Sequence, residues 1–254
     1  MRFGIVGYGR MGRLFGRCLK GEVKFYSRHR EMDFESLGEL YEWADVIVIA
    51  TSLDAVPETL KELSTIASKR PRDVVIFDIA TFKREIVGLY GEFPPEVRVA
   101  SVHPMFGEGV KSFEGQLFIV VPVEGREGDV EWVAGFLRSL GGRVEVMDAE
   151  EHDRIVGLVV GVPYLIGLKY LEISAEIGLG RFGGTSHRFL TTYGKAVLND
   201  SPEFIAEVLE RSREEIEEFI RALGKMPNFE GLLNKISENE IKDAYRRLYR
   251  VLEP

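Results

Sequence analysis

The chain has 254 residues, and its 33 Lys and Arg against 41 Asp and Glu give a formal net charge of −8. This balance excludes broad binding to a nucleic-acid backbone, which requires a basic face. Hydrophobic residues make up 45% of the chain, enough for a sizeable core, so a disordered protein is excluded. The single cysteine, Cys18, excludes a disulfide scaffold and a zinc site built from cysteines. We expect a soluble, cytoplasmic protein with one or two domains.

Residues 1–149 alternate short β-branched runs with stretches that have apolar residues at helical spacing. Several of the runs are almost entirely apolar, as strands buried on both faces of a parallel sheet are. This alternation predicts a Rossmann-like, doubly wound α/β domain. The predicted strands are 2–6, 23–26, 45–50, 74–78, 97–102, 117–122 and 143–147, and the predicted helices between them include 11–20, 57–67 and 130–140.

The pattern changes to all-helical over residues 150–254. Asp148 followed by Glu151 fits a capping box that opens a helix. Residues 201–222 and 238–252 place apolar side chains at helical spacing among Glu, Arg and Lys. The longest apolar run, 157–168, is shorter than a bilayer span requires. We therefore predict a second, helical domain over 150–254. Few Asn and Gln beside many Glu, Lys and Arg also indicate a thermophilic source.

A glycine-rich turn follows the first predicted strand. Gly7, Gly9 and Gly12 form G-x-G-x-x-G, which permits a tight turn, close approach of a pyrophosphate and close packing of helix on strand. In this strand–turn–helix context the motif predicts dinucleotide binding, and the alternative is a purely structural turn. The predicted cofactor-binding residues are Gly7, Tyr8, Gly9, Arg10, Met11, Gly12, Ser27, Arg28, Thr51 and Ser52.

The residues after the second predicted strand bear on the choice of nicotinamide cofactor. A fold that binds NAD usually has Asp or Glu there, bonded to the ribose hydroxyls. This chain has Ser27 followed by Arg28. A guanidinium can pair with the 2′-phosphate of NADP, and no carboxylate at the strand end repels that phosphate. We predict NADP as the cofactor, with NAD as a second option; the alternative reading of Arg28 is a solvated basic loop. No metal site is predicted.

His103 follows the predicted strand 97–102 and precedes Pro104-Met105-Phe106-Gly107. Ligands of open parallel sheets bind outside the carboxyl ends of the strands, so His103 is well placed for chemistry. The alternative is a core histidine that stabilises its loop. The segment Asp78-Ile79-Ala80-Thr81-Phe82-Lys83 also follows a strand and should reach the same crevice.

These segments together resemble the prephenate dehydrogenase family of tyrosine biosynthesis. The resemblance implies a dinucleotide domain followed by a helical domain that binds substrate and forms a homodimer. It also implies oxidative decarboxylation of prephenate, or of its transaminated relative arogenate, with hydride transfer to NAD(P)+. The motifs that carry it are G-x-G-x-x-G, Asp78-x-x-Thr81-x-Lys83, His103-Pro104-Met105-Phe106-Gly107, Glu151-His152-Asp153 and Ser186-His187-Arg188.

The resemblance implies a role for each matching residue. His103 would be the base that acts on the ring hydroxyl of the substrate. Thr81 stands where the family usually has serine, and would bond the same hydroxyl and the histidine. Arg188 would bind the ring carboxylate, and His187 and Lys83 are candidates for substrate contact, although a surface lysine is an alternative for Lys83. Glu151, His152 and Asp153 would mainly anchor the interdomain helix, since acidic residues suit a helix start.

One segment departs from the family pattern. Many members have Ser-His-Leu-Pro-His after Glu-His-Asp, whereas this chain has Val160-Gly161-Val162-Pro163-Tyr164. Substrate contacts made by those two histidines are therefore not transferred to this chain, which looks closer to the enteric-type branch.

Two other classes of protein stay open on the residues alone. A small Rossmann-plus-helical reductase, of the imine, pyrroline-carboxylate or β-hydroxyacid type, would share the glycines but would not explain His103 together with Arg188. A noncatalytic NADP-sensing regulator would keep the glycine turn and Arg28 without His103, Thr81 and Arg188 in one cleft. The expected partners are a small-molecule substrate and a second copy of the chain, with neither nucleic acid nor membrane.

Overall fold

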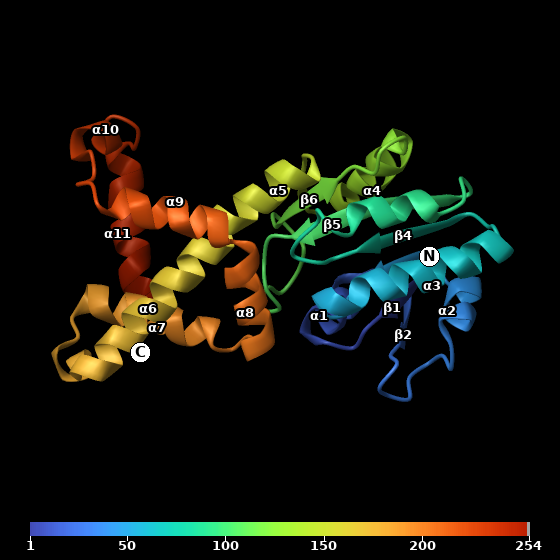
Figure 1. Ribbon diagram of the computed structural model, residues 1–254, viewed down its shortest axis with the longest axis horizontal. Coiled ribbons are helices and arrows are strands. Elements are labelled where there is room, and N and C mark those ends of the chain that lie inside the picture. Colours follow the sequence, from blue (N-terminus) through green and yellow to red (C-terminus); the bar gives the residue numbers. More distant parts are fainter. Residues whose placement is uncertain (253–254) are drawn as a thin grey trace. The chain divides into compact units, whose positions relative to one another are not determined.

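The computed structural model describes residues 1–252, and side chains through residue 250. The chain divides into two compact units, Met1–Asp153 and Arg154–Pro254, of which the first holds the sheet and the second is helical (Figure 1). The sequence placed the boundary after residue 149. The structural division falls after Asp153 instead, and the side chains of His152 and Asp153 hydrogen-bond within the first unit.

The first unit contains a seven-stranded sheet in the order β2-β1-β3-β4-β5-β6-β7. All seven predicted strands are present, and the sheet is mostly parallel. The exception is β6, which pairs antiparallel with β5, from Ser101↔Val121 to Pro104↔Phe118. Residues 105–116 join these two strands without a crossover helix, and only an antiparallel pair permits that. The strands are β1 (Arg2–Val6), β2 (Glu22–Tyr26), β3 (Val46–Ile49), β4 (Val74–Asp78), β5 (Val97–Pro104), β6 (Leu117–Val121) and β7 (Arg143–Val146).

Helices cover both faces of this sheet (Figure 1). On one face, α1 (Arg10–Cys18) and α4 (Glu127–Ser139) pack against alternate strand residues such as Phe3 and Ile5. On the other face lie α2 (Leu37–Trp43) and α3 (Val56–Lys69); Gly4 in β1 lets Leu40 approach closely there. The sequence analysis missed the short α2, although Ser36 is its N-cap and accepts a hydrogen bond from the Glu39 N–H. The 3₁₀ turns are η1 (Leu53–Ala55) and η2 (Val87–Glu92).

The second unit is helical, as predicted. The predicted cap is confirmed, because Asp148 Oδ1 accepts hydrogen bonds from the N–H groups of Glu150 and Glu151 at the start of α5. The helix continues through a π-helical segment, so that residues 149–177 form one rod. The elements are α5 (Ala149–Val156), η3 (Gly157–Gly161), α6 (Val162–Ile177), η4 (Leu179–Phe182), α7 (Thr185–Val197), α8 (Pro202–Arg211), α9 (Arg213–Leu223), α10 (Phe229–Leu233) and α11 (Glu238–Leu252).

The helix Ala149–Ile177 has 29 residues and is longer than the apolar run 157–168 that it contains. Within residues 1–252 it is the one helix whose length and composition would allow it to cross a membrane, and 28% of its apolar window is buried. The large apolar side chains of this helix that are exposed are Leu158, Val159, Ile166, Ile173 and Ile177.

Candidate active site

The glycine turn between β1 and α1 has the geometry that a dinucleotide requires. Gly7 has φ +105°, and a Cβ there would lie 2.5 Å from the Ala50 carbonyl oxygen. A Cβ on Gly12 would lie 2.3 Å from the Gly7 carbonyl oxygen. Gly9, the N-cap of α1, has open space around its Cβ position and offers no side-chain cap. The helix therefore begins beside an open space, where backbone N–H groups and the helix dipole favour a diphosphate.

A polar atom without a partner adjoins this turn. Thr51 Oγ1 is buried and, among the described residues, has no hydrogen-bond partner. Thr51 follows β3, and its backbone nitrogen lies 3.1 Å from the position of a Gly7 Cβ. A buried hydroxyl without a partner costs free energy, so a ligand that bonds it would be stabilised. The turn and Thr51 together fit a bound nicotinamide dinucleotide.

Four other predicted cofactor-binding residues, Tyr8, Arg10, Met11 and Ser52, differ in their contacts and exposure. Arg10 forms an ion pair with Glu108 at 3.1 Å, which ties the glycine turn to the loop after β5. Tyr8 packs edge-on against Phe25, with ring centroids 4.9 Å apart. Met11 packs against the core of the first unit. Ser52 is exposed just before η1.

Arg28 lies beside two carboxylates that the sequence argument did not foresee. Its guanidinium pairs with Glu58 at 2.6 Å and with Glu62 at 2.7 Å, both on α3. The premise that no carboxylate opposes a phosphate here is therefore wrong, because the fold supplies acids from another element. The signal available in the sequence was the i, i+4 spacing of these two glutamates. The loop 27–35, which includes Ser27 and Arg28, borders with Glu39 a cavity of about 730 Å³.

His103 stands near the end of β5 and is joined to a second histidine. It is 7% exposed, and its Nδ1 lies 2.9 Å from His152 Nε2. His152 is completely buried, and its Nδ1 lies 2.7 Å from Asp153 Oδ1. Three side chains from two distant segments thus form one chain of hydrogen bonds.

Asp153 is anchored by the segment after β4. Its Oδ1 accepts from the Lys83 N–H at 2.8 Å, and its Oδ2 accepts from the Arg84 N–H at 3.0 Å. Burial by itself raises the pKa of this carboxyl, but the hydrogen bonds from His152, Arg84 and Lys83 outweigh burial and lower its pKa. Asp153 is therefore an anion at neutral pH.

Beneath His103 lies a fully buried ion pair. Lys83 Nζ donates to Asp78 Oδ1 and to the Val102 carbonyl, each at 2.7 Å. The other oxygen of Asp78 accepts from Tyr90 at 2.8 Å and from Ser101 at 2.5 Å. Lys83 was predicted as a substrate-binding residue, but its side chain is enclosed and directed at Asp78. Its evident role in this structure is to hold β4 and β5 together below the site.

The surroundings of His103 favour its neutral form. Burial is the main cause that holds the pKa of His103 well below its ordinary value, and the nearby His152 and Lys83 lower it further. A neutral imidazole is the form that can accept a proton. His103 is thus prepared to act as a base over the whole neutral range.

The structure does not bring every predicted residue to His103. Thr81 follows β4 and is partly exposed, and its hydroxyl makes no hydrogen bond to His103 or to another described side chain. His187 and Arg188 lie on α7 in the second unit. His187 Nε2 bonds Ser174 Oγ at 2.8 Å, while its Nδ1 is buried without a partner among the described residues. Arg188 is exposed. The substrate contacts of these three residues stay predictions.

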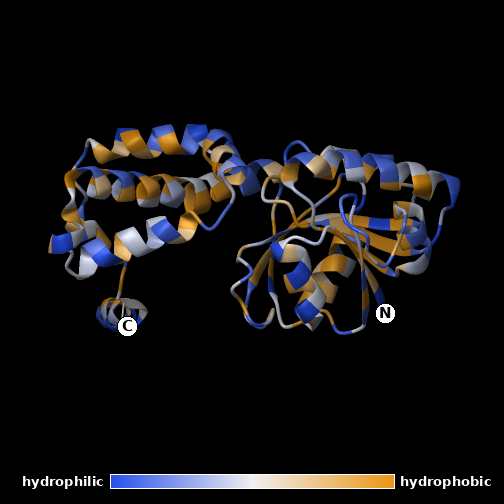
Figure 2. Cartoon of the chain, turned by 90° about the horizontal axis from the view of Figure 1, so that it is seen from below, coloured by the Kyte–Doolittle hydropathy of each residue, from blue (hydrophilic) through white to orange (hydrophobic). Residues whose placement is uncertain are grey.

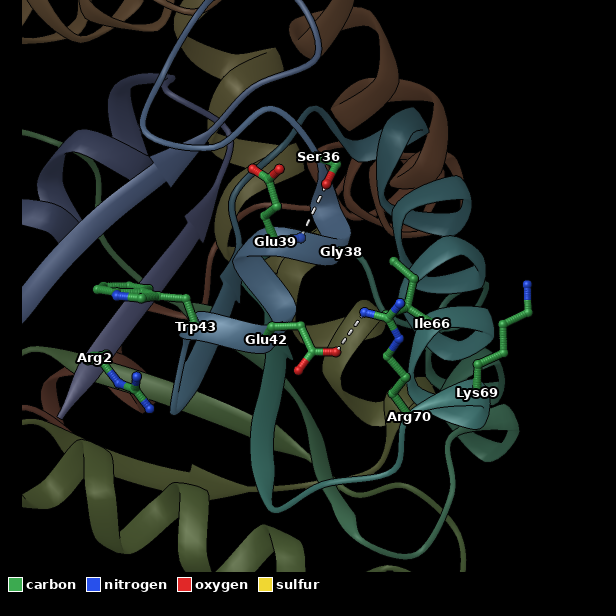
Figure 3. Close-up of a pocket in the computed structure, with 9 residues that line it drawn as sticks. All are labelled: Arg2, Ser36, Gly38, Glu39, Glu42, Trp43, Ile66, Lys69 and Arg70. Atoms are coloured by element: carbon green, nitrogen blue, oxygen red, sulfur yellow. Dashed lines mark hydrogen bonds and ion pairs between the residues drawn. The ribbon is translucent and has the colours of Figure 1, made fainter.

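Another cavity, of about 650 Å³, lies at the opposite edge of the sheet (Figure 3). Arg2 at the start of β1, Trp43 at the end of α2 and Arg70 after α3 border it. Two of its charged groups, Arg70 and Glu42, form an ion pair with each other, and Arg2 pairs with Asp45. The amino ends of parallel strands are not where such sheets bind ligands, so the chemistry is placed at His103.

Comparison with known proteins points in one direction. The family model for the prephenate dehydrogenase nucleotide-binding domain matches residues 13–146. A Methanocaldococcus jannaschii protein named "Probable arogenate/prephenate dehydrogenase" is 26% identical over 173 residues, which are 65% of this chain and 38% of that protein. The T-protein of Haemophilus influenzae is 27% identical over 148 residues, or 58% of this chain and 38% of the relative. The chain therefore spans about two fifths of the length of these relatives.

A solved structure matches over nearly the whole chain. Prephenate dehydrogenase from A. aeolicus, crystallised in complex with hydroxyphenyl propionate and NAD+, superposes with a TM-score of 0.70 at 21% sequence identity. The match covers 99% of this chain and 94% of that chain. At this level of identity the likeness shows a shared fold.

Proposed function

Because the chain belongs to the prephenate dehydrogenase family, we propose that it oxidatively decarboxylates prephenate to 4-hydroxyphenylpyruvate, or arogenate to tyrosine, in tyrosine biosynthesis. The observation that carries the proposal is the buried, neutral His103 at the carboxyl end of β5, in the same unit as a glycine turn built for a dinucleotide. A small reductase or a sensor of the kinds considered from the sequence is not favoured, because neither accounts for the family match.

The substrate's own chemistry defines what His103 must do. The ring carries a hydroxyl at C4 and a carboxylate at C1, and a nicotinamide held at the glycine turn would supply the acceptor for the hydride at C4. As His103 Nε2 draws the hydroxyl proton towards itself, the C4–O bond gains double-bond character. Loss of CO2 then makes the ring aromatic. One hydride and one CO2 leave the substrate and no net proton is released, so the proton returns from His103 to the phenol oxygen.

Residues outside the His103 cluster would hold the substrate. We propose that Arg188 binds the ring carboxylate through a bidentate clamp, which orients the ring for hydride transfer. His187 Nδ1 is buried without a hydrogen-bond partner among the described residues, and His187 is next to Arg188 in sequence, which supports a place at the substrate. The Thr81 hydroxyl makes no hydrogen bond within the described part of the chain, which supports a contact with the ring hydroxyl.

For the cofactor, we propose a preference for NADP+ that the two glutamates limit. Arg28 offers a guanidinium to the 2′-phosphate, but Glu58 and Glu62 already occupy that guanidinium and repel a phosphate. The same carboxylates could accept hydrogen bonds from the ribose hydroxyls of NAD+. The margin between the two nucleotides is therefore smaller than Ser27-Arg28 alone implies.

We propose a homodimer formed through the helical unit. Its described surface carries large apolar side chains such as Ile173 (48% exposed), Ile177 (66%) and Phe182 (71%). Exposed apolar side chains in this number, on a chain with a net charge of −8, favour a protein partner. A second copy would cover exposed apolar side chains of the helix 149–177. The enzyme would then be soluble, in agreement with the cytoplasmic location expected from the sequence.

The test is an absorbance assay for reduced cofactor that crosses prephenate and arogenate with NADP+ and NAD+. We expect turnover with at least one substrate, together with release of CO2. The rate should saturate at a lower concentration of NADP+ than of NAD+. No turnover with either substrate, under conditions where the protein binds nucleotide, would refute the proposed function.

A further inference from the structure

We propose that His152 and Asp153 act as positioning residues that fix the tautomer of His103 and take up the charge of its proton, so that the three side chains work as one base. The catalytic part of this inference rests on the proposed function, whereas the tautomer belongs to the resting protein. His152 and Asp153 thus have a role in the chemistry, in addition to the anchoring of a helix expected from the sequence.

The direction of the hydrogen bonds follows from Asp153. Both of its oxygens accept from backbone N–H groups, and it is an anion, so it must also accept from His152. His152 therefore carries its hydrogen on Nδ1. A neutral imidazole has one hydrogen, which leaves the Nε2 of His152 as an acceptor. The hydrogen between the two rings must then belong to His103 Nδ1.

This chain of donors leaves a defined lone pair. With its hydrogen on Nδ1, His103 has an unprotonated Nε2, and that nitrogen is the one not engaged with His152. Burial lowers the pKa of His152, although its bond to Asp153 raises it, and the net shift is downward. His152 is consequently neutral at pH 7, as the scheme requires. The base is thus set up before any substrate arrives.

The three side chains, which we call the relay (His103, His152 and Asp153), also reduce the electrostatic cost of protonating His103. When Nε2 of His103 gains the hydroxyl proton, a positive charge would form in a buried place near the ammonium of Lys83. Transfer of the Nδ1 hydrogen to His152 Nε2 moves that charge onto the ring that touches Asp153. One proton enters His103 and one leaves it, and both steps reverse when the phenol oxygen is reprotonated. Three charged groups lie around the two rings: Asp153 on α5, Asp78 at the end of β4 and Lys83 in the turn after β4. The charge of Asp78 is neutralised by its ion pair with Lys83.

Three substitutions separate the functions of the relay. His152→Phe keeps the ring volume but removes the acceptor. His152→Gln keeps an amide oxygen at a similar reach, which can accept from His103 Nδ1 but cannot take its proton. Asp153→Asn removes the anion. The matched control is Tyr41→Phe, which loses one buried hydrogen bond, from the Tyr41 hydroxyl to the Arg70 carbonyl, far from the site.

The first experiment needs no substrate. NMR of the full chain with ¹⁵N-labelled histidine distinguishes a ring nitrogen that carries hydrogen from one that does not. We expect His103 as the Nδ1–H tautomer in the wild type, in His152→Gln and in Tyr41→Phe, and a mixture of tautomers in His152→Phe. A wild-type His103 with its hydrogen on Nε2 would overturn the inference, whatever the activity.

The second experiment measures turnover against pH. We expect His152→Phe and Asp153→Asn to lower kcat by about 100-fold, at the low end of a general base's contribution, with nucleotide affinity unchanged. His152→Gln should recover part of this loss. Without the anion the protonated base is less stable, so the acid limb of Asp153→Asn should move to lower pH, while that of Tyr41→Phe stays in place. A wild-type kcat and an unmoved acid limb in both His152→Phe and Asp153→Asn would refute the relay. If the wild type oxidised neither substrate, the proposed function would be refuted, and the tautomer experiment would still test the relay.

Discussion

The two units of the chain differ in how completely they bury their apolar side chains. In the first unit the sheet is covered on both faces, and only Met1 and Val146 are large apolar side chains that are clearly exposed. In the helical unit, among the described residues, the fully buried apolar side chains are four valines, while eighteen large apolar side chains are exposed. Figure 2 shows the same contrast, with apolar colour concentrated in the strands but spread along the helices of the other unit. The first unit encloses its apolar side chains within itself, whereas the described part of the helical unit leaves many of its own exposed.

The contrast extends to buried charge, since Glu215 is the single charged side chain that is buried among the described residues of the helical unit. The first unit encloses Asp78, Lys83, His103, His152 and Asp153, and connects them by hydrogen bonds. Such groups are tolerated only where a rigid frame supplies partners for them. The expected chemistry therefore lies in the first unit, and the predicted carboxylate clamp, Arg188, lies in the helical unit. The following predictions test this division of labour.

The largest effect is expected at His103. His103→Asn keeps a polar group of similar reach but cannot accept the proton, so kcat should fall by about 100- to 10,000-fold with nucleotide affinity nearly intact. The wild type should lose activity on the acid side with one ionisation, because only the neutral imidazole is a base. Since the pKa of His103 lies well below its ordinary value, this loss should come below pH 6.5. Kinetics over a pH series check both points, and near-normal turnover of the variant would make His103 structural.

The next effect concerns the stability of the first unit. Lys83→Met leaves Asp78 buried without its cation, which should cost about 3–5 kcal/mol in the free energy of unfolding. Replacing both partners, as Lys83→Met with Asp78→Asn, should cost less. Denaturant unfolding followed by fluorescence measures both variants. If Lys83 acted mainly on substrate instead, the single variant would lose activity without losing stability.

Much of this architecture could be predicted from the sequence, and the failures have identifiable causes. The inner strands β1, β3, β4, β5 and β6 were predictable because buried strands are nearly continuous apolar runs, whereas the edge strands β2 and β7 are short, mostly unburied and contain charged residues. The antiparallel direction of β6 was not predictable, because strand direction depends on the connection and not on the run itself. His103 was found from its place after a strand, but its bond to His152 joins residues 49 positions apart. The pairing of Arg28 with Glu58 and Glu62 likewise depends on where α3 lies beside β2.

The apolar face of the helical unit gives the third prediction. Ile173→Asp should shift the protein from dimer to monomer, since a charge buried without a partner at an interface costs several kcal/mol, or more than about 100-fold in the dissociation constant. Light scattering at micromolar concentration measures the mass. An exposed position in the first unit, Val146→Asp, is the control and should leave the mass unchanged. A monomeric wild type would contradict the prediction.

The fourth prediction concerns Arg188. Replacing it with glutamine removes a bidentate partner for the ring carboxylate, and we expect KM to rise by about 10- to 100-fold. The turnover number should fall less, unless the clamp also aligns the ring. Steady-state kinetics separate the two, and binding of nucleotide alone should be unaffected. An unchanged KM would remove Arg188 from the substrate site.

The smallest effect is expected at the nucleotide's ribose. Arg28→Gln should weaken NADP+ by about 1–3 kcal/mol, the value of a hydrogen bond to a charged group, and should barely change NAD+. Glu62→Gln should act in the opposite sense, because it frees one side of the guanidinium and removes a charge that repels the 2′-phosphate. Calorimetric titration of both nucleotides against the three proteins measures the shifts. If Arg28 only braces α3, its loss would lower stability and leave the ratio of NADP+ to NAD+ affinity unchanged. Equal wild-type affinity for the two nucleotides would contradict the proposed preference for NADP+.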